Sequence, residues 1–445
     1  MEISRRTFVA TGMTAMAVAY VGSQSGLCWG QMETGTKPTG EDGSKLWLRY
    51  PRMEADALPR YVRAARGVLV EGSSQTSRVA REEVELALDG MLGGANRAIG
   101  PDLDDGAVLV GTTKNSATIR GMNLAADLSQ LGPKGFLLRT MTWKGKNITA
   151  IASEGEVRAL HGAFHWLRLM QTRSAVENLA VAQQPRVMLR TVNHGDNLNG
   201  TIERGYGGRS NWNWNDLPDK MSPRYMIYAR ASASVGINGA VLNNVNADTR
   251  MLTPPYLKKV AALADLWRPY GIRVYLSVNF AAPVTLGKLA TADPLDEGVA
   301  AWWKAKADEI YELIPDFGGF RVKANSKGQP GPKDYQRTHV QGANVMAEAL
   351  APHQGNVIWR AFVYDDNVDP DRAKRAYIEF MALEGQFRPN VLVQIKNGPI
   401  DFQPREPFHP LFGALVKTPA MMEVQPTQEY LGQAKHLVYL GPMCK

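Results

Sequence analysis

Cysteine is scarce in this sequence, where only Cys28 and Cys444 occur among 445 residues. They form no C-x-x-C pair, and the seven histidines contain no H-E-x-x-H motif or other close metal-ligand spacing. We therefore expect no structural zinc site, no other metal and no cofactor. Cys28 falls in a leader segment described below, so only Cys444 would remain in the mature chain and no intrachain disulfide is expected.

Runs of like charge are also missing. The net charge of +8 comes from lysines and arginines scattered along the chain, without a basic run or an aromatic–basic repeat. This pattern favours a solvated basic surface over nucleic-acid binding. An apolar content of 44% and a charged content of 21% are typical of a globular protein, and the length allows two or three domains with a large core.

The first residues, MEISRRTFVATGMTAMAVAYVG, have the layout of a signal peptide, which we assign to residues 1–31. Their apolar stretch is too short, and too interrupted by Gly and Thr, to form a stable membrane span. Arg5 and Arg6 lie in a run, SRRTF, that resembles a twin-arginine export signal. It predicts a bacterial protein exported to the periplasm or the extracellular space, whereas an amphipathic start is the alternative. Residues 32–45 have the composition of a linker.

Residues 46–175 have the pattern of a small α/β domain. Short β runs such as GVLVEG, AVLVGT and GFLLRT alternate with helical stretches, and SEGEVRALHGAFHWLRLMQT places its apolar residues on one helical face. His161 and His165 lie one turn apart in that stretch and have the spacing of metal ligands. The sequence offers no third metal ligand to go with them, so we interpret both as ordinary helix residues.

Residues 176–445 have a different sequence pattern. Short apolar runs alternate there with long amphipathic segments such as PYLKKVAALADLWRPYG and DEGVAAWWKAKADEIYELI. The runs are RVMLRTVNH, INGAVLNNV, IRVYLSVNF, GFRVKANS, VIWRAFVY, NVLVQIKN and AMMEVQP. Repeated β-α units with non-alternating strands predict a parallel sheet. No G-x-G-x-x-G opens a helix, so a TIM (β/α)8 barrel fits better than a doubly wound sheet. Residues 438–440 are the one candidate for an eighth strand, so we expect a barrel that is incomplete at its C-terminal end.

Polar residues follow the predicted strands, at the end where (β/α)8 barrels place their chemistry. Lys323, Arg360 and Lys396 follow three different strands and should converge, and a cluster of cations predicts an anionic ligand. Asp401 and Glu429 are carboxylates at later strand ends, as hydrolysis of a glycoside requires. Salt-bridged structural residues are the alternative. Other candidates at strand ends are His194, Asp196, Asn243, Asn244, Asn279 and Lys327.

Five long blocks resemble one known family: NHGDNLNGTIERGYGGRS, GINGAVLNNVNA, VKANSKGQPGP, VQIKNGPIDFQPREPFHPLFG and MEVQPTQEYLGQ. Over about residues 40–445 they are similar, nearly block for block, to the α-glucuronidases of glycoside hydrolase family 67. The resemblance implies an N-terminal α/β domain, a (β/α)8 barrel and a C-terminal helical domain that forms a homodimer. It also implies hydrolysis, with inversion, of the α-1,2 bond between (4-O-methyl)glucuronic acid and the terminal xylose of xylan-derived aldouronic acids.

The same resemblance implies roles for individual residues. Asp401 and Glu429 match the carboxylates that activate water. The uronate carboxylate would be held by Lys323, Arg360 and Lys396, and Val245 would form a wall beside O4 of the sugar. His194 and Asp196, in the block NHGDN, are further substrate-binding candidates.

The sequence also departs from the family pattern. Lys327 stands in SKG where the family has the glutamate that acts as general acid, and a lysine with an ordinary pKa of ~10.4 is a weak proton donor near neutral pH. Gly195 stands where the family has a tryptophan that forms a platform for the sugar. The chain stops at Lys445, where family members continue, so we expect no helical domain and no dimer. The alternatives to an active α-glucuronidase are a catalytically impaired uronate-binding protein and a fragment without function.

Overall fold

The computed structural model describes residues 43–94, 97–98, 102–205, 207–326, 328–363, 365, 367–400 and 407–425. The expected leader, both cysteines and the candidate eighth strand at 438–440 lie outside these residues. The chain divides into two units, Met1–Leu48 and Arg49–Lys445, and the second contains both β-sheets. Among the described residues, no helix is long and apolar enough to cross a membrane.

The first sheet has the strand order β2-β1-β3-β5-β4-β6. Its strands are β1 Gly67–Val70, β2 Arg97–Ala98, β3 Ala107–Thr112, β4 Phe136–Trp143, β5 Lys146–Ser153 and β6 Ala180–Gln183. Strands β1, β2, β3 and β5 are parallel, and β4 runs antiparallel to both β5 and β6. This sheet therefore continues beyond residue 175, where we expected the barrel to begin, and the domain boundaries themselves stay predictions.

The turn between β4 and β5 was not anticipated from the sequence, which pointed only to the first of the two strands. Trp143 pairs with Lys146 across a turn made by Lys144 and Gly145. Both turn residues have positive φ, at 48° and 78°, as a two-residue hairpin loop with this twist requires. The helices of this region are α2 Leu58–Ala64, α3 Gln75–Leu92, α4 Ala117–Gly121, α5 Ala125–Leu131 and α6 Glu156–Gln171.

Helix α6 is the stretch whose apolar face we predicted from its periodicity. Leu160, Phe164 and Leu167 are buried along it, as that pattern indicates. His161 packs beside Arg158, and burial together with this neighbouring charge lowers the pKa of His161 to about 3. The ring of His165 lies 5.6 Å from that of Phe136. Both histidines therefore pack as helix residues, and the described residues contain no group of three His, Cys, Asp or Glu placed to hold a metal.

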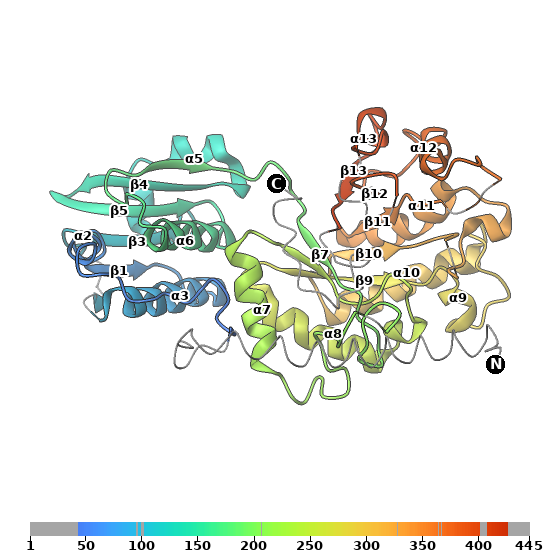
Figure 1. The fold of residues 1–445 in the computed structure, drawn as a ribbon, viewed down its shortest axis with the longest axis horizontal. Helices are drawn as coiled ribbons and strands as arrows, with labels where there is room; N and C mark the ends of the chain where they lie inside the picture. Colours follow the sequence, from blue (N-terminus) through green and yellow to red (C-terminus); the bar gives the residue numbers. More distant parts are fainter. Residues whose placement is uncertain are drawn as a thin grey trace, which may run out of the picture. The chain divides into compact units, whose positions relative to one another are not determined.

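In the described part of the chain, the second sheet consists of seven parallel strands in chain order, and each predicted run overlaps one of them. The strands are β7 Thr191–Asn193, β8 Gly239–Val241, β9 Arg273–Val278, β10 Gly319–Val322, β11 Asn356–Arg360, β12 Val391–Lys396 and β13 Ala420–Glu423. The helices between and after them are α7 Pro223–Ser234, α8 Pro254–Trp267, α9 Ala282–Thr285, α10 Glu297–Leu313, α11 His339–Leu350, α12 Arg372–Met381 and α13 Leu411–Ala414. The sheet is curled, with its helices outside it (Figure 1). The protein is thus an α/β protein whose larger sheet is a (β/α)8-type barrel that is incomplete in the described residues.

The two faces of the curled sheet differ because successive side chains of a strand point to opposite sides. On the helix side, Phe320 of β10 packs against Trp303 of α10, and Trp359 of β11 packs against His339 of α11. On the inner side, a buried apolar layer is formed by Val241, Tyr275 and Ile358, with Leu189, Leu392 and Met421 packed against it. Two residues further along these strands, the inner side chains become polar or charged.

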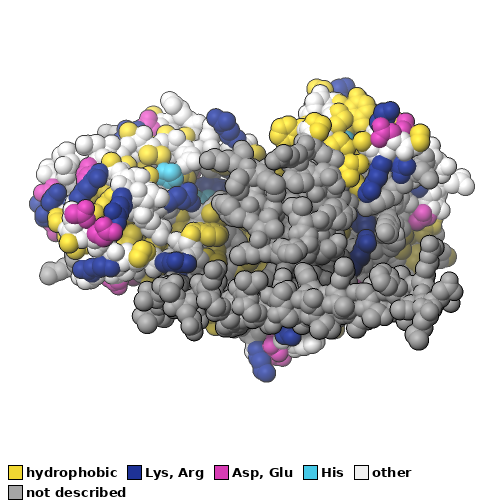
Figure 2. Space-filling view, viewed as in Figure 1, with side chains coloured by type: hydrophobic (Ala, Val, Ile, Leu, Met, Phe, Trp, Pro, Cys, Tyr) yellow, Lys and Arg dark blue, Asp and Glu magenta, His cyan; other side chains and the backbone are white. Residues whose placement is uncertain are grey.

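Exposed apolar side chains gather around α13 and β13. Phe408 and Val416 are 74% and 85% exposed, and Met422 and Val424 are 41% and 51% exposed. Figure 2 shows hydrophobic side chains at the upper right, in the region that Figure 1 labels α13 and β13.

Candidate functional site

A buried cluster of charged residues lies above the apolar layer, toward the carboxyl ends of the strands. Arg360 ends β11, and its guanidinium donates two hydrogen bonds to Glu423, the last residue of β13. The Nε–Oε2 distance is 2.9 Å and the Nη2–Oε1 distance is 2.8 Å. Arg321 of β10 lies beside this pair, with Nη2 3.3 Å from Oε1 of Glu423 and Nε donating to Gln394 at 2.8 Å. Two arginines thus share one buried carboxylate.

Two lysines complete this cluster. Lys323 directly follows β10, is 7% exposed, and donates from Nζ to Oδ1 of Asn246 at 2.6 Å. Lys396 ends β12, is 3% exposed, and places Nζ 3.0 Å from the centre of the Phe362 ring. The charges of Arg360 and Lys323 both act on Lys396, so the structure brings together the three cations that the strand ends predicted.

The charges in this cluster depend strongly on burial. Burial and the charge of Arg360 lower the pKa of Lys396 to about 5, against the opposing effect of Glu423. Burial also lowers the pKa of Arg321 to about 10, while the carboxylates of Glu423 and Glu203 act against that shift. For Glu423, burial alone would raise the pKa, but Arg360 and Arg321 outweigh it and lower the pKa to about 2.

The sequence left two interpretations of these cations open, an anionic ligand and salt-bridged structural residues. Arg360 has an internal partner in Glu423, and binding of an anion by the cluster stays a prediction. The pairing uses Nε and Nη2, and Nη1 forms no hydrogen bond with a residue that the structure describes. Glu423 therefore holds the guanidinium in one orientation through two of its three nitrogens.

His194 and Asp196 follow β7 and belong to a second polar group. Both ring nitrogens of His194 have protein partners, with Nε2 2.8 Å from the Tyr228 hydroxyl and Nδ1 3.2 Å from Nδ2 of Asn211. Burial lowers the pKa of His194 to about 4. Asp196 accepts hydrogen bonds at Oδ1 from Ser210 and from the backbone N–H of Asn211. Its Oδ2 is buried without a hydrogen-bond partner among the described residues, and burial raises the pKa of this carboxyl group.

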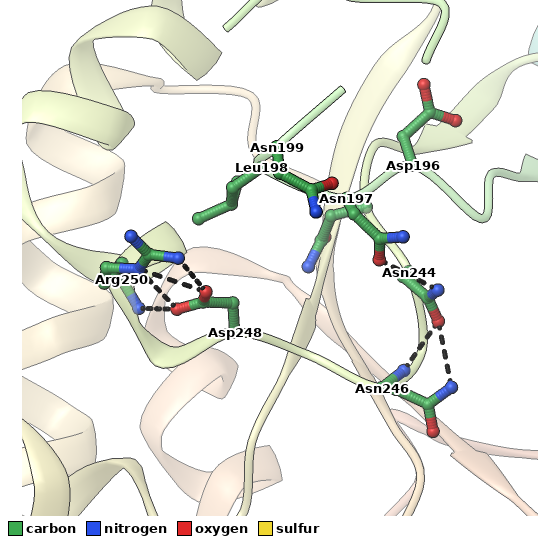
Figure 3. Close-up of a pocket in the computed structure, with 9 residues that line it drawn as sticks. Asp196, Asn197, Leu198, Asn199, Asn244, Asn246, Asp248 and Arg250 are labelled. Carbon is green, nitrogen blue, oxygen red and sulfur yellow. Dashed lines mark hydrogen bonds and ion pairs between the residues drawn. The ribbon is translucent and has the colours of Figure 1, made fainter. Parts of the chain in front are cut away.

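A cavity of about 250 Å³ lies between the segments that follow β7 and β8. Figure 3 shows its lining of amide side chains, with the Asp248–Arg250 pair at one side. The described residues that line it are Asp196, Asn197, Leu198, Asn199, Asn243, Asn244, Asn246, Asp248 and Arg250. Most of these amides bond to one another or to backbone, as Asn244 does to Asn197 at 3.0 Å and Asn243 does to the Ser277 carbonyl at 2.9 Å. They form a hydrogen-bonded polar wall that is joined to the cation cluster through Asn246 and Lys323.

The remaining predicted residues are only partly placed. Val245 is partly buried and is not among the described residues that line this cavity. The predicted catalytic residues Lys327, Asp401 and Glu429 lie outside the described residues. Their roles, and the substrate-binding roles of the residues above, stay predictions.

Reasoning from the sequence alone missed several residues of the site, among them Arg321, Glu423 and Glu203. Arg321 interrupts the apolar run GFRV, and Glu423 ends the run AMME, so a charged residue in an apolar run was the available signal. Glu203 has no comparable signal, because it lies in a polar loop. Its position is nevertheless specific: a Cβ atom at Gly195 would lie 2.6 Å from Oε1 of Glu203.

Comparisons with known proteins cover both parts of the chain. Residues 46–166 match the model of the glycosyl hydrolase family 67 N-terminus, and residues 169–445 match that of the glycosyl hydrolase family 67 middle domain. The chain is 43% identical over 417 residues to the probable alpha-glucuronidase A of Neosartorya fischeri, covering 91% of this chain and 48% of that protein. It is 42% identical over 420 residues to the alpha-glucuronidase of Hypocrea jecorina, covering 91% and 49%.

The chain spans about half the length of the curated relatives it matches. Solved structures show a weaker likeness. A GH138 enzyme targeting pectin rhamnogalacturonan II has a TM-score of 0.45 at 13% identity, with 74% of this chain and 38% of that chain covered. Similarity at this level supports no statement about function.

Proposed function

The chain belongs to glycosyl hydrolase family 67, and from that premise we propose that it binds the carboxylate of glucuronic acid and acts as an α-glucuronidase on xylan-derived aldouronic acids. The observation that supports this most directly is the convergence of Lys323, Arg360 and Lys396 at one end of the parallel sheet. The curated relatives listed above are named alpha-glucuronidases.

The geometry of Arg360 suits a carboxylate ligand. Glu423 orients its guanidinium through Nε and Nη2, so Nη1 can donate to a bound carboxylate without a large loss of side-chain entropy. Lys396 adds a charge that responds to the ligand. Its lowered pKa favours the neutral amine in the empty site, and a bound anion would favour the protonated ammonium.

For the reaction itself, we propose the roles that the family resemblance implies. Hydrolysis with inversion needs a base that activates water and an acid that protonates the leaving oxygen. Asp401 and Glu429 would supply the base, and Lys327 occupies the position of the acid. A lysine is a poor donor there, and this favours a second candidate function, a uronate-binding protein with little or no hydrolysis. Export by the twin-arginine leader would place either protein where xylan fragments occur.

Calorimetric titration of the chain with an aldouronic acid and with the matching neutral xylo-oligosaccharide tests the proposed site. Arg360→Ala should weaken binding of the aldouronic acid by about 1.5–3 kcal/mol, or roughly 10- to 150-fold, because a hydrogen bond to a charged group is lost. Binding of the neutral sugar should stay unchanged. Arg388→Ala, which removes an exposed ion pair with Glu348, is the matched control.

Two outcomes would decide against the proposal. If Arg360→Ala weakens the charged and the neutral sugar equally, Arg360 has a structural role only. If the unaltered chain binds no aldouronic acid, the cation cluster is not a uronate site. Release of glucuronic acid, followed in the same samples, separates an α-glucuronidase from a protein that binds without hydrolysis.

A further inference from the structure

Arg321, Glu423 and Arg360 form a triad on the inner side of the curled sheet, in which two cations share one anion. Nη2 of Arg321 lies 3.3 Å from Oε1 of Glu423, and Nη2 of Arg360 lies 2.8 Å from the same oxygen. The side chain of Arg321 is 4% exposed, and those of Glu423 and Arg360 are each 10% exposed. The charges of the triad are therefore poorly screened by water.

The other polar neighbour of Arg321 in the described strands is uncharged. Nε of Arg321 donates to Oε1 of Gln394 at 2.8 Å, and Gln394 is 1% exposed. An amide oxygen accepts this hydrogen bond without carrying a charge. In the part of the chain that the structure describes, Glu423 is thus the carboxylate with which both arginines form an ion pair.

The triad carries one positive charge in excess. Arginine side chains stay protonated in proteins, and Arg321 does so here at neutral pH although burial lowers its pKa to about 10. Arg360 and Arg321 together hold the pKa of Glu423 at about 2, so its carboxyl group is ionised. A single arginine with Glu423 would make a neutral pair, and the second arginine turns that pair into a cation.

We propose that Arg321 is a specificity-determining residue of the uronate site, because by sharing Glu423 with Arg360 it leaves the triad an excess positive charge that selects a carboxylate over a neutral group of the same shape. Arg321 acts through Glu423 and is therefore a positioning residue. This inference rests on the proposed function, in which Arg360 holds the ligand carboxylate together with Lys323 and Lys396. It goes further by naming the residue that keeps Arg360 from being neutralised by its own partner.

D-Glucuronate and D-glucuronamide separate charge from shape, because they share the ring and the hydroxyls and differ in a carboxylate against a neutral amide. Gln394→Glu keeps Arg321 and gives it a carboxylate of its own, where Oε1 already accepts from Nε. It should lower the preference for D-glucuronate about tenfold or more, because the excess charge is cancelled, and should change D-glucuronamide binding little. Calorimetric titration at pH 7 measures both. The charges of Glu203, Lys323 and Lys396 also act at this end of the sheet, and the substitution leaves all three in place.

Two further variants test the charge count. Arg321→Met removes the excess charge directly and should lower the preference by a similar factor. Adding Glu423→Gln to Gln394→Glu restores one excess charge, so this double variant should prefer D-glucuronate more strongly than Gln394→Glu alone does. Damaged packing would not be repaired by a second substitution. Arg273→Met is the matched control, because Arg273 is exposed and begins β9, at the opposite end of the same sheet.

The outcomes separate this inference from the proposed function. If the unaltered chain does not prefer D-glucuronate to D-glucuronamide, the cation cluster is not a uronate site and both are wrong. If the unaltered chain has this preference and Gln394→Glu keeps it, the triad does not set the selectivity for charge, while the uronate site stands. A double variant with no stronger preference than Gln394→Glu would assign the loss to packing and overturn the inference.

Discussion

Arg360 and Glu423 form a two-point ion pair across the inside of the curled sheet, although their strands, β11 and β13, are separated by β12. The pair is possible because both residues end their strands on the inner side, where alternate strands of a barrel contribute side chains to one layer. Arg321 reaches the same carboxylate from β10. Glu423 is therefore the shared ion-pair partner of two arginines in the proposed site.

Glu423→Gln should destabilise the fold by about 3–5 kcal/mol, because it leaves buried Arg360 and Arg321 without their shared carboxylate. Denaturant unfolding measures this change. Glu348→Gln is the control, since it removes an ion pair with Arg388 that is more than half exposed on both sides. It should cost at most about 1 kcal/mol. Equal effects of the two substitutions would show that the inner pair contributes no more than a surface pair.

The same carboxylate predicts how stability depends on pH. Glu423 has its pKa lowered to about 2 from an ordinary 4.5, so the folded state binds its proton less readily than the unfolded state does. Its contribution is complete above pH 4.5 and is lost as the pH falls from there toward 2. Unfolding measured from pH 6 to 2.5 should therefore show a steeper loss for the unaltered chain than for Glu423→Gln. Parallel curves would mean that Glu423 does not titrate in this window.

Lys396→Met should stabilise the ligand-free chain and weaken uronate binding. The pKa of Lys396 is lowered to about 5 from an ordinary 10.5, so between these values the unfolded state binds more protons and stability rises with pH. Removing the amine should remove that part of the slope and raise stability at pH 7, because burial of the amine opposes its protonation.

Melting curves at pH 6 and pH 9, with titration of D-glucuronate, test this prediction for Lys396. Lys304→Met on α10 is the control, because Lys304 is 65% exposed and pairs with Asp308 at the surface. A lower stability of Lys396→Met at pH 7 would show that the empty site already favours the ammonium.

Lys327→Glu should raise hydrolysis of aldouronic acids by about 10²–10⁴-fold. It would supply a carboxylic acid at the position where the family resemblance implies the general acid. An activated aryl glucuronide needs little acid assistance, so the unaltered chain should already cleave it. Lys327→Gln, which removes the ammonium without adding an acid, should show no such gain. If neither substrate is cleaved faster by Lys327→Glu, position 327 does not hold the acid.

Much of the larger sheet could be predicted because the hydrophobic pattern of a buried parallel strand is local. All seven predicted runs overlap a strand, and the predicted helices around α6, α8 and α10 are confirmed. The convergence of Lys323, Arg360 and Lys396 was predictable as well, since parallel strands end at the same edge of a sheet. The β4–β5 hairpin was only half recognised, because Lys144-Gly145 is a weak turn signal beside the Asn-Gly and Asp-Gly pairs that dominate such loops.

The sequence by itself determined the order of strands and helices and the residues that end each strand, because these depend on neighbours along the chain. Only the tertiary structure decided which charges meet. Arg360 and Glu423 are far apart in sequence, and their pairing depends on the curvature of the sheet and on the inward direction of both side chains. The same holds for Glu203. Its carboxylate lies beside Gly195, and its backbone carbonyl accepts hydrogen bonds from Asn197 and Asn244. Burial then shifts the pKa of Lys396 and Glu423, and burial is a property of the packed fold rather than of any local pattern.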